Sequence, residues 1–269
     1  MYKAPENRRI LRCFYFKIKD IKTRQNILKV HSIETFGTHD GPGVRCVVFL
    51  QGCKLKCQYC HNPDTIAMDG GKAYSVEDLF QVILKAKPYF GKKGGVTISG
   101  GEPLLQAKAL IPLFKKLKAE GIHTALDTNG RILNHFAMKL MDELTDLVML
   151  DIKHMTEEGY QEITGQKNKQ TTFNLAEYRE KSNKPMWLRY VLIPELTDKT
   201  ELLESMGTYF RDYKSIERLE LQPYHKLGVH KWQALGWKYP LDNARENTDD
   251  ELATAVAVLK PYFKEVSVN

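Results

Sequence analysis

Short apolar segments alternate six times with longer amphipathic segments along this chain, and this alternation constrains its fold more than any other feature. The apolar segments are rich in Val, Ile, Leu and aromatic residues and have the length of strands: Val44–Leu50, Gly95–Ser99, His123–Asp127, Leu147–Ile152, Met186–Ile193 and Arg218–Gln222. The amphipathic segments are predicted helices: Ser75–Lys87, Ala107–Glu120, Leu133–Leu144, Thr171–Lys181, Lys199–Tyr213 and Asp249–Tyr262. Parallel strands need a crossover, usually a helix, so the pattern predicts an α/β fold with a parallel sheet.

The basic charge of the chain is concentrated at its N-terminus. Residues 1–30 hold nine of the 40 Lys and Arg and two of the 33 Asp and Glu, which leaves 31 of each sign in the remaining residues. A neutral body removes most of the electrostatic case for nucleic-acid binding. The basic segment contains no Ser, unlike an organelle transit peptide. We therefore predict a flexible basic extension, residues 1–30, and a single catalytic domain, residues 31–269, because α/β barrels of this size commonly form one domain.

The cysteines indicate a reducing compartment. There are five, and an odd number with three close together disfavours a disulfide framework. No apolar run approaches the roughly 20 residues that cross a bilayer, and the N-terminus lacks the apolar core of a secretory signal. We predict a cytoplasmic protein with no membrane partner.

Three cysteines, Cys53, Cys57 and Cys60, lie within eight residues just after the first predicted strand. A structural zinc site or a fully ligated cubane cluster needs four protein ligands, so a set of three suggests an iron–sulfur cluster with one iron left open to a substrate. The alternative is a zinc site with His61 as the fourth ligand. Cys46, inside the first strand, is expected to be a small buried apolar residue, and Cys13 belongs to the extension.

Polar and reactive residues fall where the predicted strands end. They are the cysteine loop, Gly100-Gly101-Glu102, Asp127-Thr128-Asn129-Gly130, Asp151-Ile152-Lys153, Arg189 within the fifth strand, and Tyr224-His225. The carboxyl ends of parallel strands converge on one face, where active sites assemble. The sequence thus predicts one pocket built from six loops.

The cysteine loop resembles that of a known family. CxxxCxxC with an aromatic residue, Tyr59, before the last cysteine resembles the signature of the radical S-adenosylmethionine (SAM) enzymes. The flanks Asp40-Gly41-Pro42-Gly43 and His61-Asn62-Pro63-Asp64 narrow the resemblance to the activases of glycyl radical enzymes. It implies a partial (β/α)6 barrel of the TIM type and one [4Fe–4S] cluster held by the three cysteines, whose open iron binds SAM. It also implies reductive cleavage of SAM to a 5′-deoxyadenosyl radical that takes hydrogen from a glycine Cα of a partner.

The resemblance further implies a set of SAM-binding residues: Tyr59, Cys60, His61, Gly100, Gly101, Glu102, Asp151, Ile152, Lys153 and His225. Glycines allow close backbone approach, and the glutamate can accept hydrogen bonds from the methionine amine. Taken alone, Gly100-Gly101-Glu102 also fits a turn before a helix, and a lone histidine such as His225 is more often structural.

Two further sites follow from the resemblance. Asp127, Thr128, Met149 and Asp151 are expected to bind a monovalent cation, since carboxylates at the ends of apolar strands need partners; helix capping by Asp127 is the alternative. Asp40, Gly41, Pro42, Gly43, His61 and Arg189 are expected to hold the partner's glycine loop. By itself the Asp40–Gly43 segment is a tight turn.

The segment Pro223–Trp232 resembles the PYHxLGxxKW motif of the activases that act on pyruvate formate-lyase. Residues 62–99 contain no additional cysteines, so one cluster per chain is expected. The implied partners are pyruvate formate-lyase and a flavodoxin or ferredoxin as electron donor, with a monomeric chain. An activase of another glycyl radical enzyme, such as the anaerobic ribonucleotide reductase, remains an alternative. A zinc-stabilised nucleic-acid-binding module is a further alternative.

Overall fold

The computed structural model describes residues 26–269. Most of the expected extension, with Cys13, lies outside the described residues. Residues 27–30 form the start of the first strand, where Leu28 and Val30 are buried in the main core. Within the described range no helix is long and apolar enough to cross a membrane.

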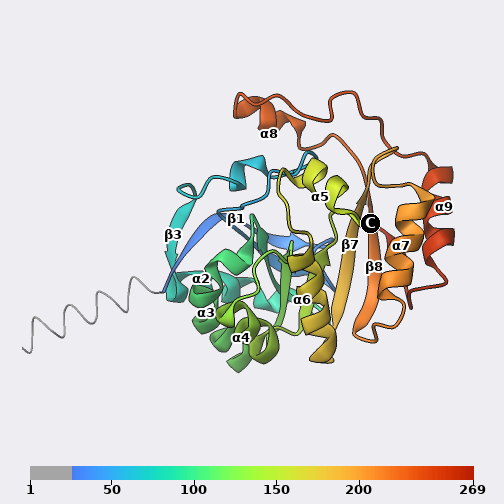
Figure 1. Ribbon diagram of the computed structural model, residues 1–269. Coiled ribbons are helices and arrows are strands. Elements are labelled where there is room, and N and C mark those ends of the chain that lie inside the picture. The colour runs from blue at the N-terminus through green and yellow to red at the C-terminus, as the bar shows by residue number, and fades with distance from the viewer. Residues whose placement is uncertain (1–25) are drawn as a thin grey trace, which may run out of the picture.

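One nine-stranded sheet forms the centre of the molecule (Figure 1), with the order β3-β1-β2-β4-β5-β6-β7-β8-β9. The strands are β1 (Ile27–Gly37), β2 (Arg45–Leu50), β3 (Lys72–Ser75), β4 (Gly95–Gly100), β5 (His123–Thr128), β6 (Leu147–Asp151), β7 (Met186–Leu192), β8 (Ile216–Pro223) and β9 (Val266–Val268). The pairs from β2 to β9 are parallel, whereas β1 pairs antiparallel with both β2 and β3. The parallel strands curve into the partial barrel that was predicted.

In the described part of the chain, eight helices surround this sheet, most of them on its outer face. They are α2 (Val76–Ala86), α3 (Ala107–Ala119), α4 (His135–Leu144), α5 (Glu157–Thr164), α6 (Gln170–Lys181), α7 (Thr200–Phe210), α8 (Val229–Ala234) and α9 (Asp249–Leu259). Figure 1 shows α7 and α9 beside the β8 end of the sheet, while α8 lies beyond the strand ends at the top of the view. Short 3-10 turns occur at Pro63–Thr65, Lys87–Tyr89 and Pro103–Gln106.

Successive residues of the parallel strands point to opposite faces, and the two faces have different chemistry. On the outer face, apolar side chains such as Leu126, Val148 and Leu188 join the main core under the helices. On the inner face, the lower layer is apolar and contains Met149 and Trp187. Two residues further along the inner face come the charged side chains of the strand ends. The interior of the barrel therefore has an apolar floor and a polar mouth.

Local sequence explains where several helices begin. The Ser75 side chain accepts a hydrogen bond from the backbone of Asp78 and caps α2. Thr248 and Glu251 form a reciprocal capping box at α9. All six predicted strands and six predicted helices occur within a few residues of their expected bounds. Three strands, β1, β3 and β9, and two helices, α5 and α8, were not predicted.

Candidate active site

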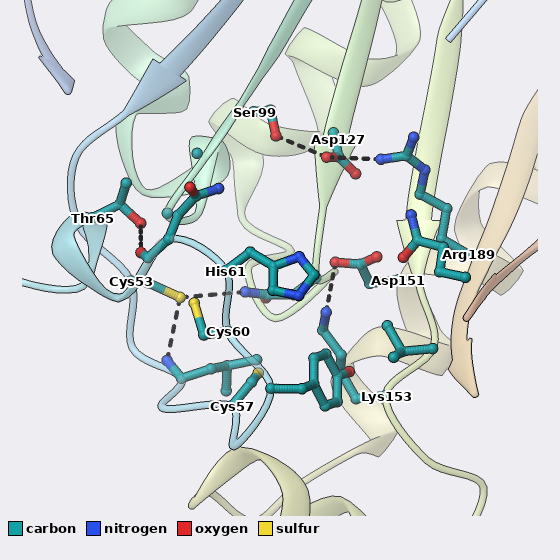
Figure 2. A pocket seen from close by; sticks show the side chains of 18 of the residues that line it. Cys53, Cys57, Cys60, His61, Thr65, Ser99, Asp127, Asp151, Lys153 and Arg189 are labelled. Atoms are coloured by element: carbon teal, nitrogen blue, oxygen red, sulfur yellow. Dashed lines mark hydrogen bonds and ion pairs between the residues drawn. The ribbon is translucent and has the colours of Figure 1, made fainter. Parts of the chain in front are cut away.

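A cavity of about 650 Å³ opens at the carboxyl ends of the parallel strands. All six segments that the sequence placed at strand ends contribute to its lining, from the cysteine loop to the Tyr224-His225 pair. Figure 2 shows the labelled side chains of Cys53, Asp127, Asp151 and Arg189 around this one space. The prediction that the six loops form a single pocket is confirmed.

The three cysteines of the loop all line the cavity. Burial raises the pKa of Cys53 and Cys57 to about 12 and that of Cys60 to about 11, so thiolates here need a positive partner. The Cys53 sulfur accepts hydrogen bonds from the Leu55 backbone at 3.4 Å and from the Asn129 amide at 3.7 Å. Three buried thiols that share a cavity and need positive charge to ionise fit the donor set of an iron–sulfur cluster.

A single metal ion fits this donor set less well. Within residues 26–269, no three Cys, His, Asp or Glu side chains converge as the ligands of one ion would. An iron–sulfur cluster needs no such convergence, because each thiolate binds a different iron. A zinc site made by the cysteines and His61 is therefore not supported by the geometry.

The cysteine loop is held by segments far along the chain. The Trp232 indole donates a hydrogen bond to the Cys60 carbonyl at 2.8 Å, and backbone bonds join Lys56 and Gln58 to the end of α5. A second apolar cluster covers the loop and consists of Leu55, Cys57, Tyr59, Ile163, Ile193, Tyr224, Trp232, Tyr239 and Leu241. An apolar cover of this kind limits solvent access to a cluster and thereby affects its potential.

Charged side chains line the same cavity, and the charge of Lys153 acts directly on the Cys57 thiol. Arg189 pairs with Asp127 at 3.2 Å, and Lys153 pairs with Asp151 at 2.8 Å. Burial raises the pKa of Asp127 to about 6 even though Arg189 opposes the shift. Burial alone would lower the pKa of Lys153, but the charge of Asp151 raises it well above its usual range. The second oxygen of Asp127, Oδ1, is buried without a hydrogen-bond partner, and a cation would fit there.

Glu102 occupies a different position from the one expected of a direct SAM ligand. Its carboxylate is 2% exposed and does not line the cavity. It accepts hydrogen bonds from the Leu104 backbone at 2.9 Å, the Thr128 hydroxyl at 2.7 Å and the Asn129 backbone at 2.9 Å. Burial raises its pKa to about 7. These contacts fix the loop after β4 against the loop after β5.

The connection between β1 and β2 reaches into the barrel from its other end. Gly41 and Gly43 have φ values of 114° and 70°, which other residues rarely adopt, and the Asp40 side chain lines the cavity. Arg189 donates a hydrogen bond to the His39 carbonyl, and the His39 ring contacts Asn269 at 2.8 Å. Because β1 and β9 lie toward opposite ends of the sheet, the His39–Asn269 contact spans the open side of the barrel.

Most of the residues singled out in the sequence line the cavity: Asp40, Cys53, Cys57, Tyr59, Cys60, His61, Gly100, Gly101, Asp127, Asp151, Lys153, Arg189 and His225. The others are absent from the lining: Gly41, Pro42, Gly43, Glu102, Thr128, Met149 and Ile152. Ile152 belongs to the main core, and the Met149 side chain lies in the apolar floor. The assigned roles of all these residues remain predictions. Lining residues that the sequence did not indicate include His39, Ser99, Gln222 and Asn269.

Comparison of the sequence identifies its relatives. Residues 47–206 match the model of the radical SAM superfamily. The chain is 44% identical over 235 residues to the pyruvate formate-lyase-activating enzyme of Streptococcus mutans. The aligned region covers 84% of this chain and 88% of that protein. It is 41% identical over 242 residues to the pyruvate formate-lyase 1-activating enzyme of Escherichia coli K12, covering 88% of this chain and 97% of that protein.

Solved structures share the fold at lower identity. A domain of the pyruvate-formate lyase-activating enzyme from Bacteroides vulgatus superposes with a TM-score of 0.55 at 20% identity, covering 65% of this chain and 99% of that one. SuiB from Streptococcus suis, bound to its precursor peptide SuiA, superposes with a TM-score of 0.64 at 16% identity and covers 100% of this chain and 57% of that one. At such identities the similarity supports the fold alone.

Proposed function

The chain belongs to the pyruvate formate-lyase-activating enzymes of the radical SAM superfamily, and from this premise we propose that it installs the glycyl radical of pyruvate formate-lyase. The observation that carries the proposal is that Cys53, Cys57 and Cys60 line the same cavity as the charged strand ends. A [4Fe–4S] cluster bound by the three cysteines would supply the electron for the reductive cleavage of SAM, and this cleavage would provide the radical that takes hydrogen from a glycine Cα of the partner. A glycine radical is favoured because both flanking amides delocalise it and no side chain blocks access.

The residues around the cavity perform binding and positioning. The backbone at Gly100 and Gly101 lines the cavity, and its lack of side chains permits close approach by the methionine part of SAM. Lys153, held by Asp151, directs a positive charge toward the same space, where it suits the SAM carboxylate. His225 packs against His61 with ring centroids 4.2 Å apart and an angle of 31° between the ring planes, which restrains both rings at the cavity wall.

A monovalent cation between Asp127 and Asp151 forms part of the proposal. Its support is the unpartnered Oδ1 of Asp127, which is buried inside the cavity wall. Thr128 and Met149 would contribute through their backbone groups, because the Thr128 hydroxyl is engaged with Glu102 and the Met149 side chain lies in the floor. The cation would offset the negative charge that these carboxylates bring to a buried place.

The glycine loop of the partner would lie over the turn at Asp40, between His61 and Arg189. Asp40 and Arg189 both line the cavity and offer an acceptor and a donor to a peptide backbone. We further propose a flavodoxin or ferredoxin as reductant, a monomeric chain and a cytoplasmic location, the last because the thiols need a reducing compartment.

Anaerobic reconstitution tests the proposed function. The chain, loaded with iron and sulfide, is mixed with SAM, a reductant and purified pyruvate formate-lyase, and the glycyl radical is recorded by electron paramagnetic resonance. We expect roughly four irons per chain and a glycyl doublet on the partner. A signal on the anaerobic ribonucleotide reductase, with none on pyruvate formate-lyase, would reassign the partner.

A further inference from the structure

A buried arginine beneath the Asp40–Gly43 turn has no part in the chemistry described above. Arg45, the first residue of β2, is 0% exposed. Its neighbours Cys46 and Val48 belong to the main core under the helices, so the alternation along the strand places Arg45 on the inner face of the sheet. Its guanidinium donates hydrogen bonds to the Thr97 hydroxyl and to the carbonyls of Pro42 and Val96. The same guanidinium also contacts the ring nitrogen and the carbonyl of His123, at 3.3 and 3.4 Å. These hydrogen-bond partners are neutral, and the negative charges that act on Arg45 come from Asp40 and Asp146, which lie further away. Burying a charged side chain among neutral acceptors is costly, so a role other than core filling is indicated.

The acceptors explain what the arginine does. The Pro42 carbonyl belongs to the turn, and the Thr97 hydroxyl that Arg45 contacts donates in turn to the Asp40 carbonyl at 2.6 Å. Two of the four carbonyls in the turn are therefore held from the amino-terminal end of the barrel. Asp40 is also one of the residues that line the cavity.

Close packing around Gly41 and Gly43 restricts the conformation of this turn. A Cβ at Gly41 would lie 3.2 Å from the Arg45 side chain, and one at Gly43 would lie 2.6 Å from the Gly94 backbone. A turn with two glycines at positive φ is flexible in isolation, because glycine has the largest conformational freedom to lose. The arginine fork binds several acceptors at once with fixed geometry, which suits it to holding such a turn in one orientation.

We propose that Arg45, acting with Thr97, is a positioning residue for the partner's glycine-loop peptide. It holds the turn so that Asp40 faces the cavity in the orientation that the bound peptide needs. Pre-organisation of this kind lowers the entropic cost of binding and improves the affinity for the peptide, not the rate of the chemical step. The inference rests on the proposed function, because it takes the turn as the peptide platform.

The test compares three variants of the cluster-loaded full chain. Arg45→Lys keeps the charge but loses the fork, and Thr97→Val removes the bridging hydroxyl with little change of shape. Thr124→Val is the matched control. Thr124 is equally buried on the neighbouring strand β5, and its hydroxyl bonds to the Leu144 carbonyl at 2.7 Å, away from the turn.

The substrate is a synthetic peptide that carries the radical-bearing glycine of pyruvate formate-lyase with its flanking residues. We expect the KM for this peptide to rise about tenfold in Arg45→Lys and several-fold in Thr97→Val, as for the loss of buried hydrogen bonds to a charged group. Turnover at saturating peptide should change less than about twofold, because the reacting groups are untouched. Thr124→Val should match the wild type in both constants.

Two results would overturn the inference alone: an unchanged KM in both variants with an active wild type, or a fall in turnover at unchanged KM. If Arg45→Lys does not fold, Thr97→Val decides the question: its KM for the peptide should rise while its turnover at saturating peptide stays nearly unchanged. A wild type that forms no glycyl radical on the peptide or on intact pyruvate formate-lyase would overturn the proposed function and this inference together.

Discussion

The carboxylate of Glu102 accepts a hydrogen bond of 2.7 Å from the hydroxyl of Thr128, which joins the loop after β4 to the end of β5. The same carboxylate accepts from the Asn129 backbone, and the Asn129 amide reaches the Cys53 sulfur. One buried acid thus connects three of the loops that form the cavity. Glu102 fixes the shape of the site without facing into it.

Replacing Glu102 by Gln should weaken SAM binding about tenfold or more. One of the two carboxylate oxygens becomes an amide that cannot accept, so a buried donor from Leu104 or Asn129 is left without a partner. Anaerobic equilibrium binding of SAM to the cluster-loaded variant measures the change. Iron content per chain should equal that of the wild type, since all three cysteines remain and Glu102 contacts Cys53 only through Asn129. Unchanged SAM affinity would contradict the role given to this carboxylate.

Cys57→Ala should abolish cluster-dependent SAM cleavage and leave the chain folded. The thiol is lost from the ligand set, whereas the free energy of unfolding should fall by only about 1–2 kcal/mol, because the atom removed is small. Cys46→Ala is the matched control, since Cys46 is fully buried on β2 and belongs to the main core. Iron analysis, SAM cleavage and circular dichroism report the outcome. Cleavage retained in Cys57→Ala would refute the cluster assignment.

Trp232→Phe should make the cluster more labile. The substitution removes the hydrogen bond to the Cys60 carbonyl and leaves most of the apolar cover in place. We expect the visible absorbance of the cluster to bleach several-fold faster in air or chelator, as a loosened loop admits solvent. Trp237→Phe is the control. The ring centroids of Trp237 and Trp232 are 5.9 Å apart, but Trp237 is 41% exposed. If the cluster bleached at the same rate in both variants, the hydrogen bond from Trp232 to Cys60 would not be what protects it.

Acid should destabilise the chain partly through Glu251. The hydrogen bond from Arg245, with that from the Thr248 backbone, lowers the pKa of Glu251 to about 2. An acid whose pKa is lower in the folded state stabilises that state above its ordinary pKa and loses the contribution as the pH falls from about 4.5 to about 2. Urea unfolding of the cluster-free chain should therefore be less dependent on pH over this interval in Glu251→Gln. If the free energy of unfolding fell equally with pH in the wild type and in Glu251→Gln, the capping box would have no such effect.

The sequence predicted the parallel part of the sheet and the convergence of its loops, because both depend on local patterns. β1 was missed since its apolar residues follow directly on a basic segment and its second half is mostly exposed. β9 has only three residues and depends on pairing with β8. Neither strand has a local signal strong enough to be recognised.

The supporting residues of the site were harder to find for another reason. Arg45 reads in the sequence as an ordinary charged residue at the start of a strand, and its partner Thr97 lies in the next parallel strand. His39 and Asn269 are 230 positions apart. Their roles arise from tertiary contacts, which no local spacing encodes. The Pro223–Trp232 motif, noticed as a family marker, proves to support the cysteine loop through Trp232.

The dependence of the cysteine loop on Trp232, Tyr239 and Leu241 also sets an order of events during biosynthesis. The three thiols leave the ribosome about 180 residues before the segment that shelters them. Until synthesis reaches that segment, they are open to oxygen and to stray metals. A cell that produces this enzyme must therefore protect the nascent thiols or deliver iron and sulfide only after translation has ended.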